Sequence, residues 1–303
     1  MRIALFFLFI LLVSCATERD LKNEELLLLK KKGLSLDNFS LLPKSSNEEF
    51  YILVDEKGTD EANPCMLNDS TIIYQRRTGD SKWSIYSYSF KSMKSTPFYE
   101  ENFDLFDPKI EFGGRYLICS TYEDSLKENR DIIIYDTKLK SEVRVGVRGA
   151  DDYNVTIGDN CFYYISNRND EIKSVYDKDE DLSLIRYNLY SGSETPISME
   201  KPVFFYRKYN GKNYFVDNNF NLNSGEYGDF IEHDYSYPVG SFFVENGKLY
   251  CRAFKDENSV IGFGGKNNLN IIIDEEECGT PYVKKGKIFF HAKVEDDLGI
   301  FVK

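Results

Sequence analysis

The residues that most often carry out catalysis or bind metals are few in this sequence and far apart. There are two histidines, His233 and His291, and their spacing fits no zinc-binding motif. His291 falls within an expected strand and His233 within an irregular segment. The Gly-x-Ser-x-Gly pattern that positions a nucleophilic serine is absent. We therefore assign both histidines structural roles, and the sequence indicates no catalytic residue, metal ligand or cofactor site.

Acidic residues are abundant, and one run of them resembles a calcium loop. Residues Asp177–Asp181 carry Asp at alternate positions, as oxygen ligands of Ca²⁺ often do. However, Leu182 stands where an EF-hand loop needs Gly, and Asn188 stands where it needs Glu. A solvated loop is therefore favoured over a calcium site. The 50 acidic residues also offer many carboxylate pairs for glycoside hydrolysis, but no feature selects one pair.

The first residues of the chain have the pattern of an export signal. Arg2 precedes an apolar run from Ile3 to Val13, which is too short to span a bilayer as a mature helix. The segment Leu12–Cys15 resembles the bacterial lipobox, in which a small residue precedes the modified cysteine. The resemblance implies cleavage of a signal peptide, residues 1–14, and lipidation of Cys15. Acyl chains on Cys15 would anchor the protein to a membrane.

A tether is expected between the lipidated cysteine and the folded domain, over residues 15–46. Thr17–Asp20 form a capping-box pattern, and an apolar run follows at Leu26–Leu29. Three lysines before Gly33 are typical of a helix end. We expect a short helix over residues 18–32 and a flexible lead from there to Ser46. The alternative is that the four leucines pack on the folded domain.

The five cysteines that follow Cys15 cannot all pair with one another. They contain no Cys-x-x-Cys spacing, which argues against a zinc ribbon. Cys119, Cys161 and Cys251 lie within apolar runs, where a free cysteine acts as a small hydrophobic residue. The other two are Cys65 and Cys278. Because an exported protein meets an oxidising compartment, one or two disulfides stay possible.

A short sequence pattern that occurs six times indicates the fold of the rest of the chain. Each copy has a two-residue turn, two variable positions and a β-rich run, and its fifth residue is always large. The fifth positions are Ile72, Leu117, Phe162, Tyr214, Tyr250 and Phe289. Turns such as Asn-Gly favour the positive φ angles of tight hairpins. Four strands in each period of about 40 to 45 residues are typical of a β-propeller.

The sequence therefore predicts an all-β, six-bladed propeller of four-stranded blades over residues 47–303. An unpaired apolar segment at residues 49–55 is expected to pair with residues 299–302 and to close the ring. The fourth blade is the weakest, because no outer strands are evident after Val216. We interpret Gly262–Gly265 as a turn between strands of the fifth blade. A β-sandwich, or a five-bladed ring with an insertion, is the alternative.

Two of the blades resemble the TolB-type, or WD40-like, propeller repeat. The matching segments are Phe112–Ile118 followed by Ile132–Asp136, and Gly286–Phe290 followed by Gly299–Val302. The chain lacks that family's usual Ser-Pro-Asp-Gly turn and any Trp-Asp or Gly-His signature. The resemblance implies the propeller fold, and it does not name a function.

The net charge and the export signal limit the classes of function that the protein can have. The chain has 38 Lys and Arg against 50 Asp and Glu, a net charge of −12, which argues against a nucleic-acid partner. We expect a lipid-anchored protein of the bacterial cell envelope. By resemblance to the enterobacterial sorting rule, Ala16 after the lipidated cysteine implies the outer membrane. It would act as a non-enzymatic binding or scaffold module for a protein or glycan partner. The alternative is a propeller enzyme acting on glycans. Converging carboxylates or arginines in a deep axial cleft would favour the enzyme, whereas a shallow face with exposed aromatics would favour the binding module.

Overall fold

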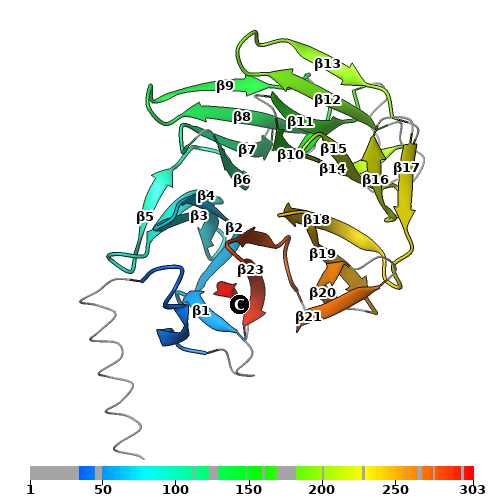
Figure 1. Cartoon of the computed structure of the whole chain (residues 1–303). Coiled ribbons are helices and arrows are strands. Elements are labelled where there is room, and N and C mark those ends of the chain that lie inside the picture. The colour runs from blue at the N-terminus through cyan, green and yellow to red at the C-terminus, as the bar shows by residue number, and fades with distance from the viewer. Residues whose placement is uncertain are drawn as a thin grey trace, which may run out of the picture.

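The protein is an all-β ring of six antiparallel sheets, each of four strands (Figure 1). The computed structural model describes residues 34–44, 50–111, 113–122, 129–147, 149–158, 161–168, 182–199, 201–226, 229–256, 258–264, 268–275, 277–294 and 297–303. The helical structure in these residues is one 3₁₀ turn, Phe39–Leu41. The predicted six-bladed propeller with four strands in each blade is confirmed.

The strands of blades 1 to 5 follow one another along the chain, with the first strand of each at the ring axis (Figure 1). Blade 1 contains β2 (Thr59–Asn68), β3 (Thr71–Thr78), β4 (Ser84–Ser89) and β5 (Lys94–Tyr99). Blade 2 contains β6 (Leu105–Glu111), β7 (Tyr116–Tyr122), β8 (Arg130–Asp136) and β9 (Ser141–Val145). Blade 3 contains β10 (Asp152–Gly158), β11 (Cys161–Ser166), β12 (Ser183–Asn188) and β13 (Glu194–Ile197).

The remaining blades keep the same order, except that the sixth is assembled from both ends of the propeller. Blade 4 contains β14 (Val203–Tyr209), β15 (Lys212–Asp217), β16 (Leu222–Glu226) and β17 (Asp229–His233). Blade 5 contains β18 (Val239–Glu245), β19 (Lys248–Lys255), β20 (Asn258–Gly264) and β21 (Leu269–Glu275). Blade 6 contains β22 (Tyr282–Lys284), β23 (Lys287–Val294), β24 (Asp297–Val302) and β1 (Tyr51–Val54).

Each repeated turn lies between the first and second strands of one blade, as predicted. The fifth blade shows why the sequence is so regular there. Asn246 and Gly247 have φ angles of 51° and 75°, which a tight two-residue hairpin turn requires. Asn and Gly adopt such angles at the lowest steric cost, and so the turn sequence recurs where the geometry recurs.

The ring closes through the pairing that the sequence predicted. Strand β1 lies antiparallel to β24, with Tyr51 opposite Val302 and Ile52 opposite Phe301. Just before β1, the ring of Phe50 packs edge-on against Phe301, with the centroids 4.8 Å apart. Strand β1 supplies the fourth strand of blade 6, and so both ends of the propeller are held in one sheet.

The segment that precedes the propeller is part of its core over residues 34–44, and the expectation of a flexible lead there is wrong. Leu36 and Phe39 are buried, and Phe39 packs edge-on against Phe90 and Phe289 at centroid distances of 5.4 and 5.7 Å. The backbone N–H of Leu34 also donates to the carbonyl of Phe90. Burial of these apolar side chains holds the segment against blades 1 and 6.

Blade 4 has the two outer strands that the sequence did not reveal. Strand β16 contains Asn223, Ser224 and Gly225, which have low β-propensity. It still pairs with β15 and β17 on both sides, and a Cβ at Gly225 would meet the Asp229 carbonyl oxygen at 2.1 Å. A small residue is therefore needed where the strands approach closely.

The interpretation of Gly262–Gly265 as a turn is wrong for Gly262, Phe263 and Gly264, which lie within β20. An added Cβ on Gly262 would meet the side chain of Leu269 at 2.4 Å. Here glycine makes room for a neighbouring strand and does not mark a chain reversal.

Several predictions concern segments outside the described residues. These are the signal peptide at 1–14, Cys15, the helix over 18–32 and the acidic run Asp177–Asp181. The five other cysteines are buried and form no disulfide with one another, and the prediction that Cys119, Cys161 and Cys251 act as small hydrophobic side chains is confirmed. In the described part of the chain, no helix has the length and apolar character needed to cross a membrane.

Candidate functional site

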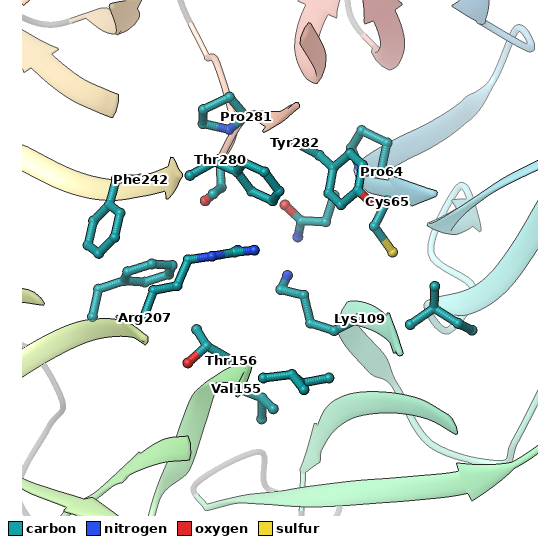
Figure 2. Close-up of a pocket in the computed structure, with 15 residues that line it drawn as sticks. Pro64, Cys65, Lys109, Val155, Thr156, Arg207, Phe242, Thr280, Pro281 and Tyr282 are labelled. Atoms are coloured by element: carbon teal, nitrogen blue, oxygen red, sulfur yellow. The ribbon is translucent and has the colours of Figure 1, made fainter. Parts of the chain in front are cut away.

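A cavity lies on the ring axis, between the first strands of the blades (Figure 2). It has a wide part of about 300 Å³ and a narrow part of about 50 Å³. The two parts share the lining residues Asn63, Lys109, Val155, Phe205 and Thr280. We call their union the axial cavity. Its wide part reaches the size of small-molecule sites.

A repeated β-bulge shapes the wide part. The pairing register shifts in five of the first strands, at Asn63, Asp107, Asn154, Phe204 and Gly240. Asn63, Asp107 and Asn154 have φ angles of 52°, 49° and 51°, which Asn and Asp tolerate better than most residues. All five residues line the wide part. A bulge re-aims side chains, and here it turns them toward the axis.

Hydrogen bonds join the blades around the wide part. The Asn63 Nδ2 donates to Asp107 Oδ1 at 2.6 Å and to Gln75 Oε1 at 3.0 Å. The Asp107 N–H also donates to Gln75 Oε1, at 2.9 Å. These bonds connect blades 1 and 2 and engage the carboxylate of Asp107. Asp107 is the only acidic residue among the described residues that line either part of the cavity.

His291 lies in the cavity wall, which the sequence did not indicate. Its Nδ1 accepts a hydrogen bond of 3.1 Å from the backbone N–H of Asn63. Burial, with a smaller contribution from the positive charge of Arg252, lowers the pKa of His291 to about 3. A Cβ on Gly279 would meet its ring at 1.8 Å, so that the backbone packs directly on the imidazole. His291 is therefore neutral at physiological pH and acts as a hydrogen-bond acceptor between blades 6 and 1.

The other histidine is far from this wall. His233 lies on β17, the outer strand of blade 4, and its Nε2 is 2.8 Å from the hydroxyl of Ser224. Burial, followed by the charge of Lys212, lowers the pKa of His233. The structure does not bring the two histidines together.

Two cationic side chains line the narrow part. Figure 2 shows Lys109 of β6 and Arg207 of β14 pointing toward one another into the cavity. The Arg207 Cζ lies 4.0 Å from the ring centroid of Phe243, which is a cation–π contact. Within the described part of the chain, Lys109 forms no ion pair closer than 4 Å.

The rest of the narrow wall is mixed, with apolar and aromatic residues beside the polar Asn63, Thr156 and Thr280. Ile110, Ile157 and Phe243 line it together with Tyr282, whose ring centroid is 4.8 Å from that of Phe243. Thr156 is 3 % exposed, and its Oγ1 has no hydrogen-bond partner among the described residues. A buried hydroxyl without a partner is uncommon and calls for an explanation.

Two other buried carboxyl groups lie outside the cavity lining. Burial raises the pKa of Glu61 to about 7 and that of Asp152 to about 6. The Arg76 Nε is 3.7 Å from Glu61 Oε1, and the Arg168 Nη2 is 3.7 Å from Asp152 Oδ1. Each acid lies two residues before a bulge, in β2 and β10 respectively, and none of these four residues lines the cavity.

The cavity residues were not predicted from the sequence, although one feature of the sequence indicates where some of them lie. Asn63-Pro64 and Asp107-Pro108 stand inside otherwise regular first strands. Because proline cannot donate a ladder hydrogen bond, such a dipeptide within a strand marks a bulge. Lys109 follows the second dipeptide directly. Arg207 has no comparable signal.

No family model matches the chain, and no curated protein matches it. Among solved structures, it is similar to a gluconolactonase from Xanthomonas campestris, with a TM-score of 0.57 at 9% identity over 86% of this chain and 92% of that one. It is also similar to a puromycin-hydrolyzing peptidase from Mycobacterium tuberculosis, with a TM-score of 0.55 at 8% identity over 78% of this chain and 41% of that one.

A third similar structure is an acylaminoacyl peptidase from Pyrococcus horikoshii, with a TM-score of 0.54 at 9% identity. It is matched over 80% of this chain, which spans 43% of the peptidase. Identities this low carry the fold and no activity. The topology and these likenesses together assign the chain to the β-propeller fold.

Proposed function

We propose that the protein is a non-enzymatic binding module of the bacterial cell envelope, anchored by lipid on Cys15, whose ligand enters the axial cavity. The export signal and the lipobox pattern at Leu12–Cys15 support the anchor. By resemblance to the enterobacterial sorting rule, Ala16 favours the outer membrane. The cavity supports the binding role, because it combines charged, hydrogen-bonding and aromatic side chains in a volume suited to a small molecule.

The observation that carries the binding role is the kind of charge in the cavity. Glycoside hydrolysis needs two carboxyl groups that flank the scissile bond. Asp107 is the only acidic residue in the described lining, and Asn63 holds its carboxylate at 2.6 Å. His291 is a poor general base near neutral pH, because its pKa is about 3. The cationic and aromatic wall is better suited to holding a ligand than to transferring its protons.

The alternative is a propeller enzyme that acts on glycans or related substrates. Two observations favour it: the cavity lies deep on the ring axis with converging cations, and similar structures include a gluconolactonase and peptidases. The peptidases are more than twice as long as the matched region, so their activity says little about this chain.

A turnover assay separates the two functions. The full chain, purified in detergent, is incubated with a panel of chromogenic glycosides, esters and lactones, alongside Asp107→Asn. The matched control is Asp80→Asn, at an exposed position outside the cavity. We expect no turnover by any of the three proteins. Turnover that Asp107→Asn abolishes and Asp80→Asn retains would establish the enzyme and overturn the proposal.

A further inference from the structure

We propose that the propeller rests on an anionic lipid membrane through one face of its ring, over blades 1 to 3. We call this the turn face, because it is formed by the turns between the first two strands and between the last two strands of the blades. In the described chain these turns are residues 69–70, 90–93, 113–115, 137–140, 189–193, 210–211, 246–247 and 285–286. The inference rests on the proposed lipid anchor, and it adds the surface of the folded domain that meets the lipid.

The sheet topology and contacts between blades place these turns on one face of the ring. Successive strands of a blade are antiparallel, and so its first and third turns lie at the same end of the sheet. The backbone N–H of Lys285 in blade 6 donates to Glu245 at the end of β18, and its Nζ donates to Asp69 in blade 1, both at 2.7 Å. An added Cβ on Gly114 of blade 2 would meet Leu67, near the end of β2, at 3.0 Å.

The two faces of the ring carry opposite charge. The described turns of the turn face contain five basic residues and one acidic residue, whereas the described loops of the opposite face contain four basic and ten acidic residues. Strands of six or seven residues separate the two faces by roughly 20 Å. Because salt screens exposed charges beyond about 8 Å, a membrane at the turn face would interact mainly with the basic turns. The net charge of −12 on the whole chain therefore does not oppose contact with anionic lipid at this face.

Most of this positive charge is not neutralised by neighbouring acids. Three of the five basic residues are exposed lysines that form no ion pair within the described part of the chain, namely Lys91, Lys138 and Lys140. The other two are paired, Arg115 with Asp136 at 3.0 Å and Lys285 with Asp69 at 2.7 Å. The unpaired lysines all belong to blades 1 and 2. Each lysine close to an anionic membrane strengthens the attraction about fivefold.

Two exposed side chains of apolar character lie beside these lysines. Leu139 stands between two of them in the β8–β9 turn and is 66 % exposed, and Tyr190 in the β12–β13 turn is 83 % exposed. The pKa of Arg115 is raised chiefly by its hydrogen bond to Asp136, and Tyr190 adds to the rise, which places Tyr190 on the same side of the ring. Leucine and tyrosine next to lysine are typical of surfaces that enter the headgroup region of a membrane.

The described chain begins on this same face. The backbone N–H of Leu34 donates to the carbonyl of Phe90, and the N–H of Phe90 donates to the carbonyl of Ser70, both at 2.8 Å. Phe90 and Ser70 belong to the two turns of blade 1. The proposed anchor at Cys15 is 19 positions before Leu34 in the sequence, a stretch that spans at most about 65 Å. The anchor therefore reaches the folded domain from the side of the turn face, and the sequence places three further basic residues, Lys30–Lys32, just before that point.

This orientation would leave the wide part of the axial cavity on the side away from the lipid. The first strand of each blade runs toward the turn face. In β6, Asp107 of the wide part precedes Ile110 of the narrow part, and in β10, Asn154 precedes Ile157 in the same way. The narrow part is therefore nearer to the turn face, and the wide part is nearer to the acidic face. A ligand of the proposed binding module would enter from the aqueous side.

Fluorescence of the full chain in vesicles tests the docking. A nitrobenzoxadiazole dye is attached at Ser92→Cys on the turn face or at Ser236→Cys on the opposite face, and the labelled wild type gives the background. Both positions are exposed, whereas the cysteines of the described chain are buried. The vesicles contain brominated lipid as a quencher, in phosphatidylcholine alone or mixed equally with phosphatidylglycerol.

Quenching of the dye reports the ratio of docked to undocked propeller. We expect quenching at Ser92→Cys in the anionic vesicles and none at Ser236→Cys. In phosphatidylcholine alone the docked-to-undocked ratio should be at least about tenfold lower, because several lysines lose their attraction to the surface. Raising the concentration of KCl should lower the ratio in the anionic vesicles.

Charge variants of the Ser92→Cys chain locate the contact. The double variant Lys138→Gln and Lys140→Gln should lower the docked-to-undocked ratio by at least about tenfold. The matched control is the double variant Lys57→Gln and Lys82→Gln, which removes two exposed lysines from the opposite face and should leave the ratio unchanged.

An apolar variant tests insertion into the headgroup region. Leu139→Ser should lower the ratio by about fivefold, since part of the leucine side chain would no longer leave water. Ile231→Ser is the control, because Ile231 is 64 % exposed on β17, the outer strand of blade 4, and it should leave the ratio unchanged. Circular dichroism and a melting curve establish that each variant is folded, and Leu139→Gln replaces Leu139→Ser if the latter does not fold.

Equal quenching at the two dye positions would overturn the docking face, as would equal quenching in the two lipid mixtures or an equal loss in the two double-lysine variants. Mass spectrometry of Cys15 judges the anchor separately. A lipidated chain without quenching at Ser92→Cys would overturn the docking face and leave the anchor standing. Quenching at Ser92→Cys in a chain whose Cys15 is unmodified would contradict the anchor and support the docking face.

Discussion

The Nδ2 of Asn63 donates a hydrogen bond of 2.6 Å to Oδ1 of Asp107, and this bond joins blades 1 and 2 at the edge of the axial cavity. Both residues lie in β-bulges with positive φ angles, 52° and 49°. Two strained backbone positions, 44 residues apart, are thus held in place by one another's side chains. Through this bond, the carboxylate of Asp107 serves as a structural hydrogen-bond acceptor.

Replacing Asn63 should therefore destabilise the propeller in two separable ways. Asn63→Ala removes the bonds to Asp107 and Gln75 and also places Ala at a φ of 52°. We expect a loss of about 2–4 kcal/mol in the free energy of unfolding. Asn63→Gly loses the same bonds without the backbone strain and should be about 1 kcal/mol more stable than Asn63→Ala. Urea unfolding measures both, and two variants as stable as the wild type would contradict the role of the bond.

The closure of the ring makes Phe50 a sensitive position. Its side chain is 3 % exposed and packs against Phe290 and Phe301 at centroid distances of 5.2 and 4.8 Å. Phe50→Ala should lower the free energy of unfolding by about 3–5 kcal/mol through the cavity it leaves. Tyr190→Ala is the control, because Tyr190 is 83 % exposed. A melting temperature that falls equally in both variants would show that closure is not the cause.

The packing of residues 34–44 predicts that this segment is needed for full stability. Phe39→Ala should cost about 3–5 kcal/mol, since its ring is buried between Phe90 and Phe289. Leu41 lies beside it on the same 3₁₀ turn and is only partly buried, so Leu41→Ala should cost less. Thermal unfolding followed by circular dichroism provides the comparison. If Phe39→Ala melts with the wild type, the segment is not part of the core.

Glu61 gives the stability a defined pH dependence. Its pKa in the folded protein, about 7, lies above the ordinary value of 4.5, chiefly because of burial. The folded state therefore binds the proton more tightly than the unfolded state, and this group lowers stability as the pH rises from about 4.5 to 7. The groups that act on it are Thr59 through a hydrogen bond, the positive charge of Arg76, and the negative charges of Glu56 and Asp55.

Glu61→Gln should remove that loss. Relative to the wild type, the variant should gain about 1–3 kcal/mol at pH 8 compared with pH 5. Glu100→Gln, at an exposed position, is the matched control and should keep the wild-type profile. Denaturant midpoints at the two pH values measure the change. A gain that is the same at pH 5 and pH 8 would show that ionisation of Glu61 is not responsible.

The proposed anchor predicts a modified N-terminus. Mass spectrometry of the mature protein should show cleavage after Ser14 and acyl chains on Cys15. Cys15→Ala should release the protein from the membrane fraction or retain its uncleaved signal. An unmodified Cys15, or cleavage elsewhere, would contradict the anchor.

Much of the fold could be predicted from the sequence, because its turns are chemically demanding. Residue pairs such as Asn246-Gly247 recur where positive φ angles are needed, and the apolar run after each turn marks the second strand. The outer strands of blade 4 could not be predicted, because Asn223–Gly225 carry small and polar side chains. Their pairing is set by the neighbouring strands, which a local pattern does not show.

The axial cavity could not be predicted, because its residues come together only when the ring closes. Lys109 and Arg207 belong to blades 2 and 4, and each looks like an ordinary strand residue in its own sequence context. The histidines, the acidic run and the cysteines are candidate site residues in the sequence because their types are chemically distinctive. The converging cations are distinctive only in three dimensions.

The most direct test of the central claim, a non-enzymatic binding module, is the turnover assay on the full chain in detergent with chromogenic glycosides, esters and lactones. We predict no turnover by the wild type, by Asp107→Asn or by Asp80→Asn. Turnover by the wild type that Asp107→Asn abolishes and Asp80→Asn retains would contradict the binding module and establish the enzyme.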